Sequence, residues 1–431
     1  MKKILAVLLA LVVVFSFASC SKDEAATTTT TTAATTTSTT ASDLKYDGVE
    51  ITMWSMWLPN EPQGKVLQEA AAAFEAETGC KVNIEFRGRD LSTIIMTALE
   101  ANEKVDLFEE DSMRIANTYA PYCLDLTEMA EAAGYADQSY AVFANDSIAR
   151  CGYLVAIAEQ PQVGGIWYNK DLFEKAGITE LPTTWDEFMD MCQQLLDAGI
   201  APMALDSTYA DFNFGYHLDR YIGQAKTKEL SLNGGWSKEP GVAAAAETII
   251  DFVEAGYLAP GAPDEYPSGQ NKLAFEQAAM VVCANYVTTE VDGVAAEPLN
   301  WGLMNYPVVP EEQGGSGSAN AYAGANSIAV VKNSKNPQAA FDFALYLTSG
   351  EWDQKMATEA QQVPADPRNE EPAKLSGSID ALLASTEPLS WTGGINENST
   401  LKTMLKEVII QLFEGQYATG AEFAAAMDAL Y

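Results

Sequence analysis

The fold of this chain is decided by a stretch in its middle, GGIWYNKDLFEKAG at residues 164–177, which PTTWDEF follows at residues 182–188. The first part predicts a strand that ends at Tyr168 and a short helix that stops at the final glycine, since glycine readily takes the left-handed conformation that ends helices. Thr184 and Glu187 have the spacing of a capping box, so a second helix is expected to begin there. These residues mainly build a scaffold.

The chain upstream of this stretch alternates between strands and helices. Apolar spacing predicts strands at residues 49–54, 81–86 and 105–108, and helices at residues 64–78 and 91–101. This order implies a parallel sheet with crossover helices. Ligands of open parallel sheets bind beyond the carboxyl ends of the strands, so the residues that follow each strand are candidate binding residues.

Aromatic and charged side chains follow all three predicted strands. The first strand is followed by Trp54 and Trp57, the second by Arg87, Arg89 and Asp90, and the third by Glu109, Glu110 and Asp111. Indole rings give apolar contact and the charged groups hydrogen-bond hydroxyls, so the combination suits a sugar. The competing interpretation is structural, with the tryptophans capping the core and Arg89 pairing with Asp90. Because neighbouring strand residues face opposite ways, we expect one or two of these three carboxylates to face the cleft, and we take Glu110 and Asp111 as the candidates.

Composition excludes some partners and sets the size of the core. The chain has 60 acidic and 25 basic residues among 431, a formal net charge of −35. Such a charge repels nucleic acid, so nucleic acid is not expected as a partner. Apolar residues make up 48% of the chain, so a folded body that begins near Leu44 can bury a large core, and its length predicts two domains.

Few residues are available for metal or nucleophile chemistry. The single histidine, His217, excludes zinc sites built on several histidines, and a lone histidine is expected to be structural. The sequence contains no GxSxG elbow, phosphate-binding loop or EF-hand spacing. We therefore expect no metal, no cofactor and no catalytic residue.

The remaining cysteines after the first 20 residues are widely spaced and form no CxxC pair. We interpret them as small apolar packing residues, with at most two disulfides as the alternative. They are Cys80, Cys123, Cys151, Cys192 and Cys283.

The N-terminus has the layout of a secretory signal, with two lysines, an apolar run at residues 4–15 and two small residues before Cys20. We predict a signal peptide at residues 1–19 and lipidation of Cys20, although Phe17 stands where such sites usually carry leucine. Residues 20–43 are rich in Thr, Ala and Ser, which predicts a flexible linker. The protein is therefore expected to be exported and lipid-anchored on the outer face of the bacterial cytoplasmic membrane; ordinary secretion with a spare thiol is the alternative.

The stretch at residues 164–188 resembles the signature of family 1 extracellular solute-binding proteins of carbohydrate ABC importers, and residues 275–280, 301–309 and 323–330 keep the order of that family. The resemblance implies an α/β periplasmic-binding-protein-like fold of type II, in which two lobes with parallel-rich sheets flanked by helices close about a hinge. The implied N-terminal lobe comprises residues 44–163 and 306–349, and the C-terminal lobe residues 164–305 and 350–431.

The resemblance also implies ligand contacts from the second lobe. The loop at residues 283–286 matches a ligand-contacting segment, but Ala284 and Tyr286 replace the glycine and tryptophan often found there, which implies an aromatic platform with an altered ligand shape. A glycine-rich loop adds Trp391, and an acidic aromatic loop adds two more residues. The complete predicted ligand-binding set is Trp54, Trp57, Arg87, Arg89, Asp90, Glu110, Asp111, Asp206, Tyr209, Asn285, Tyr286, Gly324 and Trp391.

The function implied by the resemblance is reversible capture without chemistry. A monomeric, membrane-tethered protein would bind a carbohydrate, expected to be an oligosaccharide, and deliver it to the permease subunits of an ABC importer. One alternative keeps the fold and binds a polyamine or another non-sugar solute. The second is a surface glycoside hydrolase, which needs two carboxyl groups roughly 5 to 9.5 Å apart across the bond that it cleaves.

Overall fold

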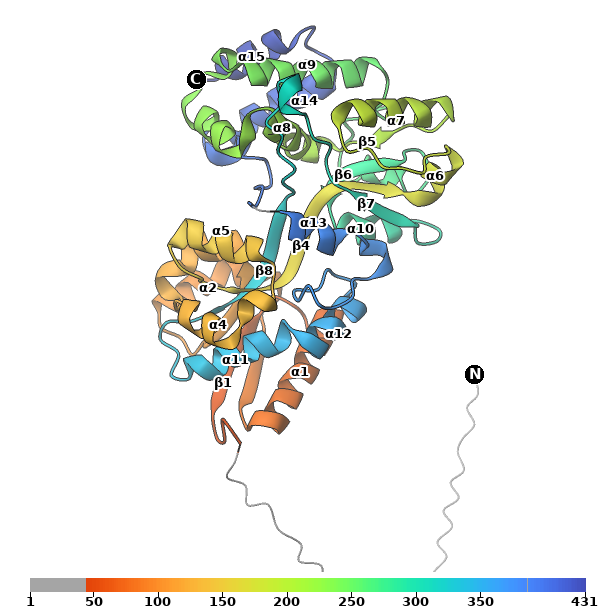
Figure 1. Ribbon diagram of the computed structural model, residues 1–431. Coiled ribbons are helices and arrows are strands. Elements are labelled where there is room, and N and C mark those ends of the chain that lie inside the picture. The colour runs from red at the N-terminus through yellow and green to blue at the C-terminus, as the bar shows by residue number, and fades with distance from the viewer. Residues whose placement is uncertain (1–43, 386) are drawn as a thin grey trace, which may run out of the picture. The chain divides into compact units, whose positions relative to one another are not determined.

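The computed structural model describes residues 44–385 and 387–431 (Figure 1). The predicted signal peptide, the lipidation site Cys20 and the linker lie outside the described residues. The unit that the structure describes, Leu44–Tyr431, begins directly after the predicted linker.

The first lobe is built on a sheet whose strand order is β2-β1-β3-β8-β4. As the periodicity predicts, β1 pairs in parallel with both β2 and β3, and β2 occupies the predicted residues. β8 is antiparallel to its two neighbours. The strands are β1 (Glu50–Ser55), β2 (Lys81–Phe86), β3 (Leu107–Asp111), β8 (Ala323–Val330) and β4 (Ile157–Asn169).

The third strand differs from its prediction. It runs to Asp111, so Glu109, Glu110 and Asp111 lie inside β3 instead of following it. The reason is the antiparallel partner β8, which pairs with β3 through its last residue, opposite Asn326. The sequence near β3 gives no sign of this distant strand, so periodicity alone ended β3 at its last apolar residue.

Helices cover both faces of the first sheet. On one face, α1 (Pro62–Thr78), α11 (Pro337–Leu347) and α12 (Gly350–Ala360) pack over Ile51, Leu107 and Val330. On the other face, α2 (Leu91–Glu100) packs over Trp54 and Phe108. The expected lobe boundary at residue 349 falls before α12, but Met356 of α12 is buried in the core that α1 and α11 form. Residues 350–360 therefore pack with the first lobe.

The second lobe has a smaller sheet and a thick layer of helices. β6 (Met280–Ala284) and β7 (Trp301–Met304) flank the second half of β4 in antiparallel pairs, and β5 (Met203–Ala204) runs parallel to β6. The helices in its core are α6 (Lys170–Lys175), α7 (Trp185–Asp197), α8 (Ala210–Asn233), α9 (Pro240–Glu254), α14 (Lys402–Phe413) and α15 (Gly420–Asp428). The remaining helices are α3 (Ser112–Arg114), α4 (Thr127–Ala133) and α5 (Ala141–Cys151), which precede β4 in the first lobe, and α10 (Val287–Asp292) and α13 (Ser378–Ala384), which follow it in the chain.

The decisive stretch folds as its sequence predicts. β4 ends at Asn169, α6 follows, and Gly177 takes a φ of +76° in the left-handed region. The capping box is present, because Thr184 Oγ1 accepts from the Glu187 amide at 3.4 Å and Glu187 Oε2 accepts from the Thr184 amide at 3.1 Å.

One strand, β4, belongs to both lobes. Its first half, residues 157–163, pairs with β8, and its second half, residues 164–169, pairs with β6 and β7. At the junction, a Cβ on Gly164 would lie 2.8 Å from Tyr322 Cβ and 2.9 Å from Tyr216 Oη. Only glycine allows β4 to pass this close to the two tyrosines.

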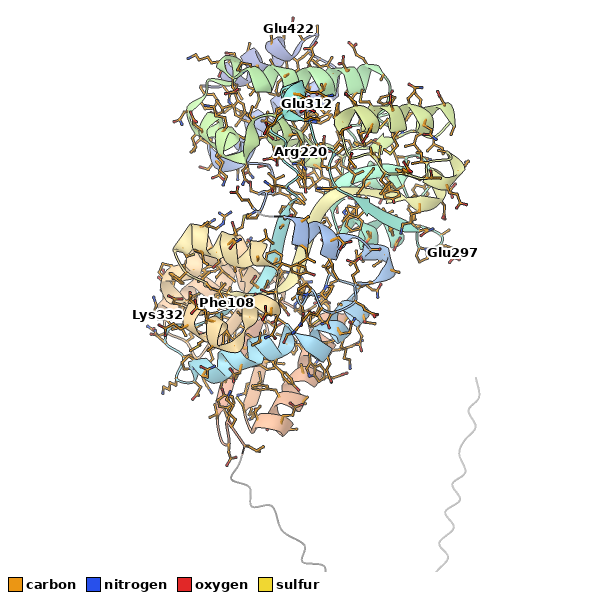
Figure 2. All side chains as sticks on the ribbon, in the orientation of Figure 1. Phe108, Arg220, Glu297, Glu312, Lys332 and Glu422 are labelled. Atoms are coloured by element: carbon orange, nitrogen blue, oxygen red, sulfur yellow. The ribbon has the colours of Figure 1, made fainter. Side chains whose placement is uncertain are left out.

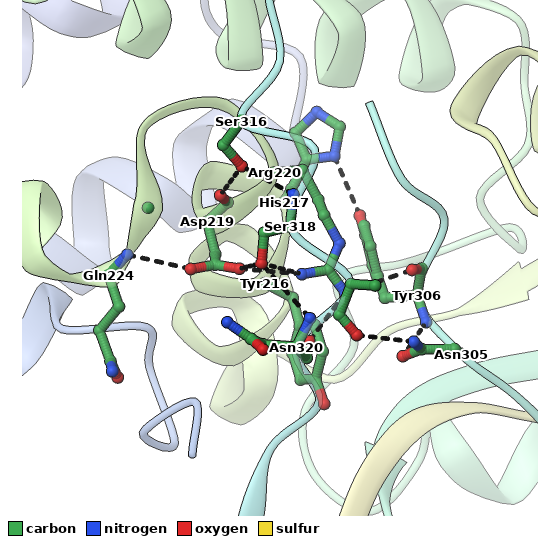
Figure 3. A network of polar contacts seen from close by, with 12 residues as sticks. Tyr216, His217, Asp219, Arg220, Gln224, Asn305, Tyr306, Ser316, Ser318 and Asn320 are labelled. Atoms are coloured by element: carbon green, nitrogen blue, oxygen red, sulfur yellow. Dashed lines mark hydrogen bonds and ion pairs between the residues drawn. The ribbon is translucent and has the colours of Figure 1, made fainter. Parts of the chain in front are cut away.

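A buried ion pair ties α8 to the segment that returns toward the first lobe (Figure 3). Arg220 is fully buried, pairs with Asp219 at 2.9 Å, and donates to the carbonyls of Tyr306, Pro307 and Asn320 at 3.2, 3.2 and 2.9 Å. Residues 306–322, expected in the first lobe, are therefore held by the second.

Phe108 and Arg220 mark the interiors of the two lobes in Figure 2, whereas Glu297, Glu312 and Glu422 are exposed.

The single histidine is structural. His217 is fully buried, with Nε2 2.7 Å from Thr248 Oγ1 and Nδ1 3.1 Å from Tyr306 Oη. Burial lowers the pKa of His217 to about 3, with the charge of Arg220 as a further cause, so the imidazole is neutral.

The five cysteines among the described residues are free. Four are packed in cores, in agreement with their interpretation as apolar packing residues, and Cys151 is half-buried.

We predict that Arg220→Met lowers the free energy of unfolding by about 3 to 5 kcal/mol, because Asp219 would remain buried without a cationic partner. Urea denaturation measures the loss. The matched control is Lys226→Met, which removes a solvent-exposed pair with Glu229 (3.1 Å) and should cost at most about 1 kcal/mol. Equal losses in the two variants would contradict the role given to Arg220.

Candidate ligand-binding site

Five aromatic side chains gather beside the junction of β4. Trp391 stacks on Phe212 with ring centres 4.0 Å apart and planes at 12°. Tyr322 meets the indole edge to face at 5.1 Å, Tyr209 lies at 6.0 Å and Tyr286 at 6.3 Å. We call these five residues the aromatic cluster. It brings together three residues that the sequence predicted with Phe212 and Tyr322, which the sequence reasoning missed.

The loop that carries Trp391 is fixed against α8. A Cβ on Gly215 of α8 would lie 2.2 Å from the Thr392 carbonyl oxygen, so only glycine permits this contact. Gln224 of α8 accepts from the Ser390 amide at 2.6 Å and donates to the Pro388 carbonyl at 3.1 Å. Trp391 is therefore held by a backbone that is already in place.

Two predicted carboxylates lie at the end of β3 in the first lobe. Asp111 caps α3 by accepting from the Arg114 amide at 2.9 Å, and burial raises its pKa. Glu110 accepts from the Arg114 guanidinium at 3.0 Å, while its other oxygen has no partner among the described residues. Burial, followed by the negative charge of Asp111, raises the pKa of Tyr322.

The other first-lobe candidates form a separate group at the edge of β1 and β2. The guanidinium of Arg87 lies 4.0 Å from the ring centre of Trp54, and that of Arg89 lies 4.3 Å from the ring centre of Trp57. Both indoles are more than nine-tenths buried. This agrees with the core-capping interpretation, and a ligand role for these four residues stays a prediction.

Arg89 does not pair with the neighbouring aspartate as the alternative interpretation has it. Its guanidinium reaches Glu61 at 3.1 Å, and Asp90 is exposed, with its backbone carbonyl accepting from Thr93 Oγ1 at 2.8 Å. A ligand contact for Asp90 also stays a prediction.

Three predicted residues support the aromatic cluster, two through hydrogen bonds to backbone amides and one by leaving space for a side chain. Asp206 is fully buried, and its carboxylate accepts from the Gly269 and Gln270 amides at 2.7 and 2.8 Å. Asn285 binds the middle of β4, because its Oδ1 accepts from the Val163 amide at 3.0 Å. A Cβ on Gly324 would lie 2.4 Å from Tyr322 Oη, so this glycine leaves room for the tyrosine.

A groove of about 560 Å³ opens between the lobes, next to the loop that precedes Trp391. We call it the α5–α8 groove, after the two helices that face each other across it (Figure 1). It is lined by Asn145, Asp146, Ala149 and Arg150 of α5, Gln224 and Lys228 of α8, and Glu387 and Pro388. Its volume falls within the roughly 300–1,000 Å³ of typical small-molecule sites.

The first-lobe sheet buries two acids: Glu109, which the sequence analysis left outside the cleft, and Glu159, which it missed. Glu109 accepts from Ser55 Oγ and the Met56 amide, both at 2.8 Å. Glu159 sits at the β-bulge of β4, is 2% exposed, and neither carboxyl oxygen has a partner among the described residues. Burial raises the pKa of both groups, and the charge of Glu109 adds to the rise for Glu159. The only sequence signal was a glutamate within an apolar strand.

We predict that Glu159→Gln stabilises the protein more at pH 8 than at pH 5. The raised pKa means that the folded state keeps a proton that the unfolded chain releases above pH of about 4.3, so the free energy of unfolding falls as pH rises toward the folded-state pKa. Glutamine removes this titration. Urea denaturation between pH 5 and 8 measures the gap between variant and wild type, with the exposed Glu254→Gln as control. A gap that does not widen with pH contradicts the assignment.

Two lobes joined by a shared strand, with aromatic rings and carboxylates beside an interlobe groove, define a binding protein of the periplasmic-binding-protein type. The sequence model for bacterial extracellular solute-binding proteins matches residues 59–354, and the chain belongs to this family. Across residues 44–385 and 387–431, the structure contains no helix with the length and apolar character needed to cross a membrane.

Two relatives in sequence illustrate the family. The diacetylchitobiose binding protein DasA of Streptomyces coelicolor is 23% identical over 392 residues, which cover 84% of this chain and 86% of that protein. A putative binding protein of Brucella abortus is 26% identical over 223 residues, 49% of each chain. The chain thus spans about half the length of the Brucella relative that it matches.

Solved structures share the fold. A probable secreted solute-binding lipoprotein from Streptomyces coelicolor matches with a TM-score of 0.72 at 16% identity, over 89% of this chain and 98% of that one. A chitin oligosaccharide binding protein matches with a TM-score of 0.62 at 20% identity, over 88% and 97% of the two chains. At these identities the likeness shows the two-lobed fold alone.

Proposed function

We propose that this protein is a monomeric extracellular receptor that captures an oligosaccharide between its lobes and delivers it to the permease of an ABC importer. The observation that carries the proposal is the aromatic cluster, in which Trp391 is half-buried; Asp111, at the end of β3, offers a carboxylate on the first lobe. Aromatic faces pack on the apolar faces of sugar rings, and carboxylates accept hydrogen bonds from hydroxyls.

Capture follows from contacts with both lobes. A ligand that contacts Trp391 on one side and Asp111 on the other prefers the state in which the lobes are closed. The ligand shifts the equilibrium between the open and closed states only by its preference for the closed state. A shift of the closed-to-open ratio from 1:99 to 99:1 takes about 10⁴-fold tighter binding to the closed state. The shared strand β4 supports a hinge, because its two halves pair with different strands in the two lobes.

Two carboxylates, Asp146 and Asp111, are engaged by the protein itself, which favours binding over hydrolysis. Asp146 is held by Arg150, whose Nε donates to both of its oxygens at 2.9 and 2.8 Å, and Asp111 caps α3. A glycosidase needs one carboxyl group that is free to donate a proton to the leaving oxygen. Two similar proteins are named for such ligands, diacetylchitobiose for DasA and chitin oligosaccharide for a structural neighbour, and this supports an oligosaccharide here.

We predict that a sugar which this protein binds raises its unfolding temperature. Trp391→Ala should lower the affinity for that sugar by at least about tenfold, because the ring on which the sugar stacks is lost. Ligand at about 100 times its dissociation constant adds roughly 2.7 kcal/mol of stability. Trp352→Ala is the control, because this half-buried tryptophan packs against Tyr346 in the first lobe, with ring centres 6.1 Å apart and planes tilted by 39°.

The same assay separates the alternatives. A thermal shift with spermidine but with no sugar would indicate a polyamine-binding protein. Cleavage of the bound sugar, detected by chromatography of the recovered ligand, would indicate a glycoside hydrolase. Either result would replace the proposed function.

The membrane tether rests on the sequence around Cys20. We predict that Cys20→Ser moves the protein from the membrane fraction to the medium, because the acyl chains that hold it cannot be attached. Cell fractionation and immunoblotting measure the distribution, with Thr30→Ala in the linker as the control that stays on the membrane. Membrane retention of the Cys20→Ser protein would rule out the lipid anchor.

A further inference from the structure

Helix α8 is kinked at Gly223. This residue has a φ of 74° and a ψ of 155°, a combination that only glycine adopts readily, and a Cβ there would meet no atom within 4 Å. In an unbroken helix, the Gln224 amide would donate to the Arg220 carbonyl. Here the Gln224 amide donates to Asp219 Oδ1 at 2.9 Å (Figure 3). The Arg220 carbonyl accepts instead from the Ser316 amide at 2.7 Å, so the kink gives both groups other partners.

The buried carboxylate of Asp219 joins this kink to residues 306–322, which we call the returning segment. Its Oδ1 accepts from the Gln224 amide, and its Oδ2 accepts from Ser318 Oγ at 2.6 Å. The returning segment leads directly into β8, a strand of the first-lobe sheet. One carboxylate therefore binds the kink of α8 through one oxygen and a crossing between the lobes through the other.

The side chain of Gln224 extends this connection to residues 388–391, which we call the Trp391 loop. Its Oε1 accepts from the Ser390 amide at 2.6 Å, and its Nε2 donates to the Pro388 carbonyl at 3.1 Å. Both hydrogen-bonding groups of the side chain are thus used on the backbone of one loop. The backbone amide of Gln224 is held by the first-lobe crossing through Asp219, while its side chain holds the loop that carries the indole.

The Trp391 loop also contacts the returning segment directly. The Leu389 amide donates to the Ala321 carbonyl at 3.2 Å, and Tyr322 meets the indole of Trp391 edge to face at 5.1 Å. The kink of α8, the returning segment and the Trp391 loop therefore form a closed ring of contacts. Since β8 continues the returning segment and pairs with β3 and with the first half of β4, a movement of the first-lobe sheet is expected to reach the indole through this ring.

We propose that Gln224 is a positioning residue for ligand capture: it fixes the orientation of Trp391 and, through Asp219, ties the Trp391 loop to the segment that crosses between the lobes. This inference rests on the proposed function, in which Trp391 contacts the ligand. It goes further, because Gln224 acts through the loop and does not itself have to touch the ligand. A ring that is held in place before binding lowers the ordering cost of binding.

Fluorine NMR reports the surroundings of Trp391 without any ligand. The exported protein, carrying Cys20→Ser, is labelled with 5-fluorotryptophan, and Trp391→Phe identifies its signal among those of eight tryptophans. Gln224→Met keeps the length of the side chain but removes both bonds to the Trp391 loop, so we expect this signal to shift or broaden. Gln354→Met is the matched control, because this half-buried glutamine makes the same pair of bonds to the backbone of Glu370, at 2.8 and 3.0 Å.

A second variant tests the tie to the crossing between the lobes. Ser318→Ala removes the hydroxyl that donates to Asp219 and lies outside the Trp391 loop. We expect it to shift the same fluorine signal, because Asp219 also holds the Gln224 amide. Ser334→Ala is the matched control: Ser334 Oγ donates to the buried Asp106 at 2.6 Å, in the first lobe, and its loss should leave the signal in place.

Affinity separates a positioning role from a merely structural one. Isothermal titration uses N-acetylated chito-, xylo- and malto-oligosaccharides as probes. For a sugar that binds, Gln224→Met should lower the affinity by about tenfold, as expected when one or two hydrogen bonds that hold the ring are lost. Gln354→Met should keep the wild-type affinity, even where urea denaturation shows an equal loss of stability in the two variants.

The outcomes separate this inference from the proposed function. A Trp391 signal that stays in place in Gln224→Met or in Ser318→Ala overturns the inference and leaves the sugar receptor standing, and so does wild-type affinity in Gln224→Met. If the wild-type protein binds none of the sugars, the proposed function fails, and the role in capture fails with it. A displaced signal in both variants, with weaker binding in Gln224→Met and neither change in the controls, supports the inference.

Discussion

The rest of this structure depends on a single strand that is hydrogen-bonded into two sheets. β4 pairs with β8 through residue 163 and with β6 and β7 from residue 164 onward, so the two lobes share one continuous backbone. The crossing point needs Gly164, because two tyrosines occupy the space of a side chain. The aromatic cluster gathers beside this crossing point, where Tyr322 contacts both Gly164 and Trp391.

Buried hydrogen bonds within the protein support the site, and they are present before any ligand binds. Asn285 binds β4 at Val163, Asp206 holds two amides of the 269–270 loop, and Arg220 holds three carbonyls of the returning segment. Such contacts contribute little net stability when complete but cost several kcal/mol when broken, so they fix one arrangement. The aromatic cluster is thereby assembled before ligand arrives, which lowers the ordering cost of binding.

Local features were predictable from the sequence, and contacts between distant segments were not. The capping box of Thr184, the stop at Gly177 and the parallel pairing of β1 and β2 depend on neighbouring residues or on simple periodicity. The length of β3 depends on β8, about 200 residues away, and α12 joins the first lobe through its contact with α1. For the site, Tyr209, Tyr286 and Trp391 were predictable as candidates, but Phe212 and Tyr322 look like ordinary core residues until the fold brings them together.

In the proposed mechanism, the bound sugar brings the two lobes together and is not cleaved. The distance between the lobes reports this closure most directly. Spin labels at Ala141→Cys in α5 and Ala225→Cys in α8, in a chain with Cys20→Ser and Cys151→Ser, report this distance by double electron–electron resonance. The account predicts that the sugar found by the thermal assay shortens the mean distance and is recovered uncleaved. An unchanged distance at saturating sugar would contradict it.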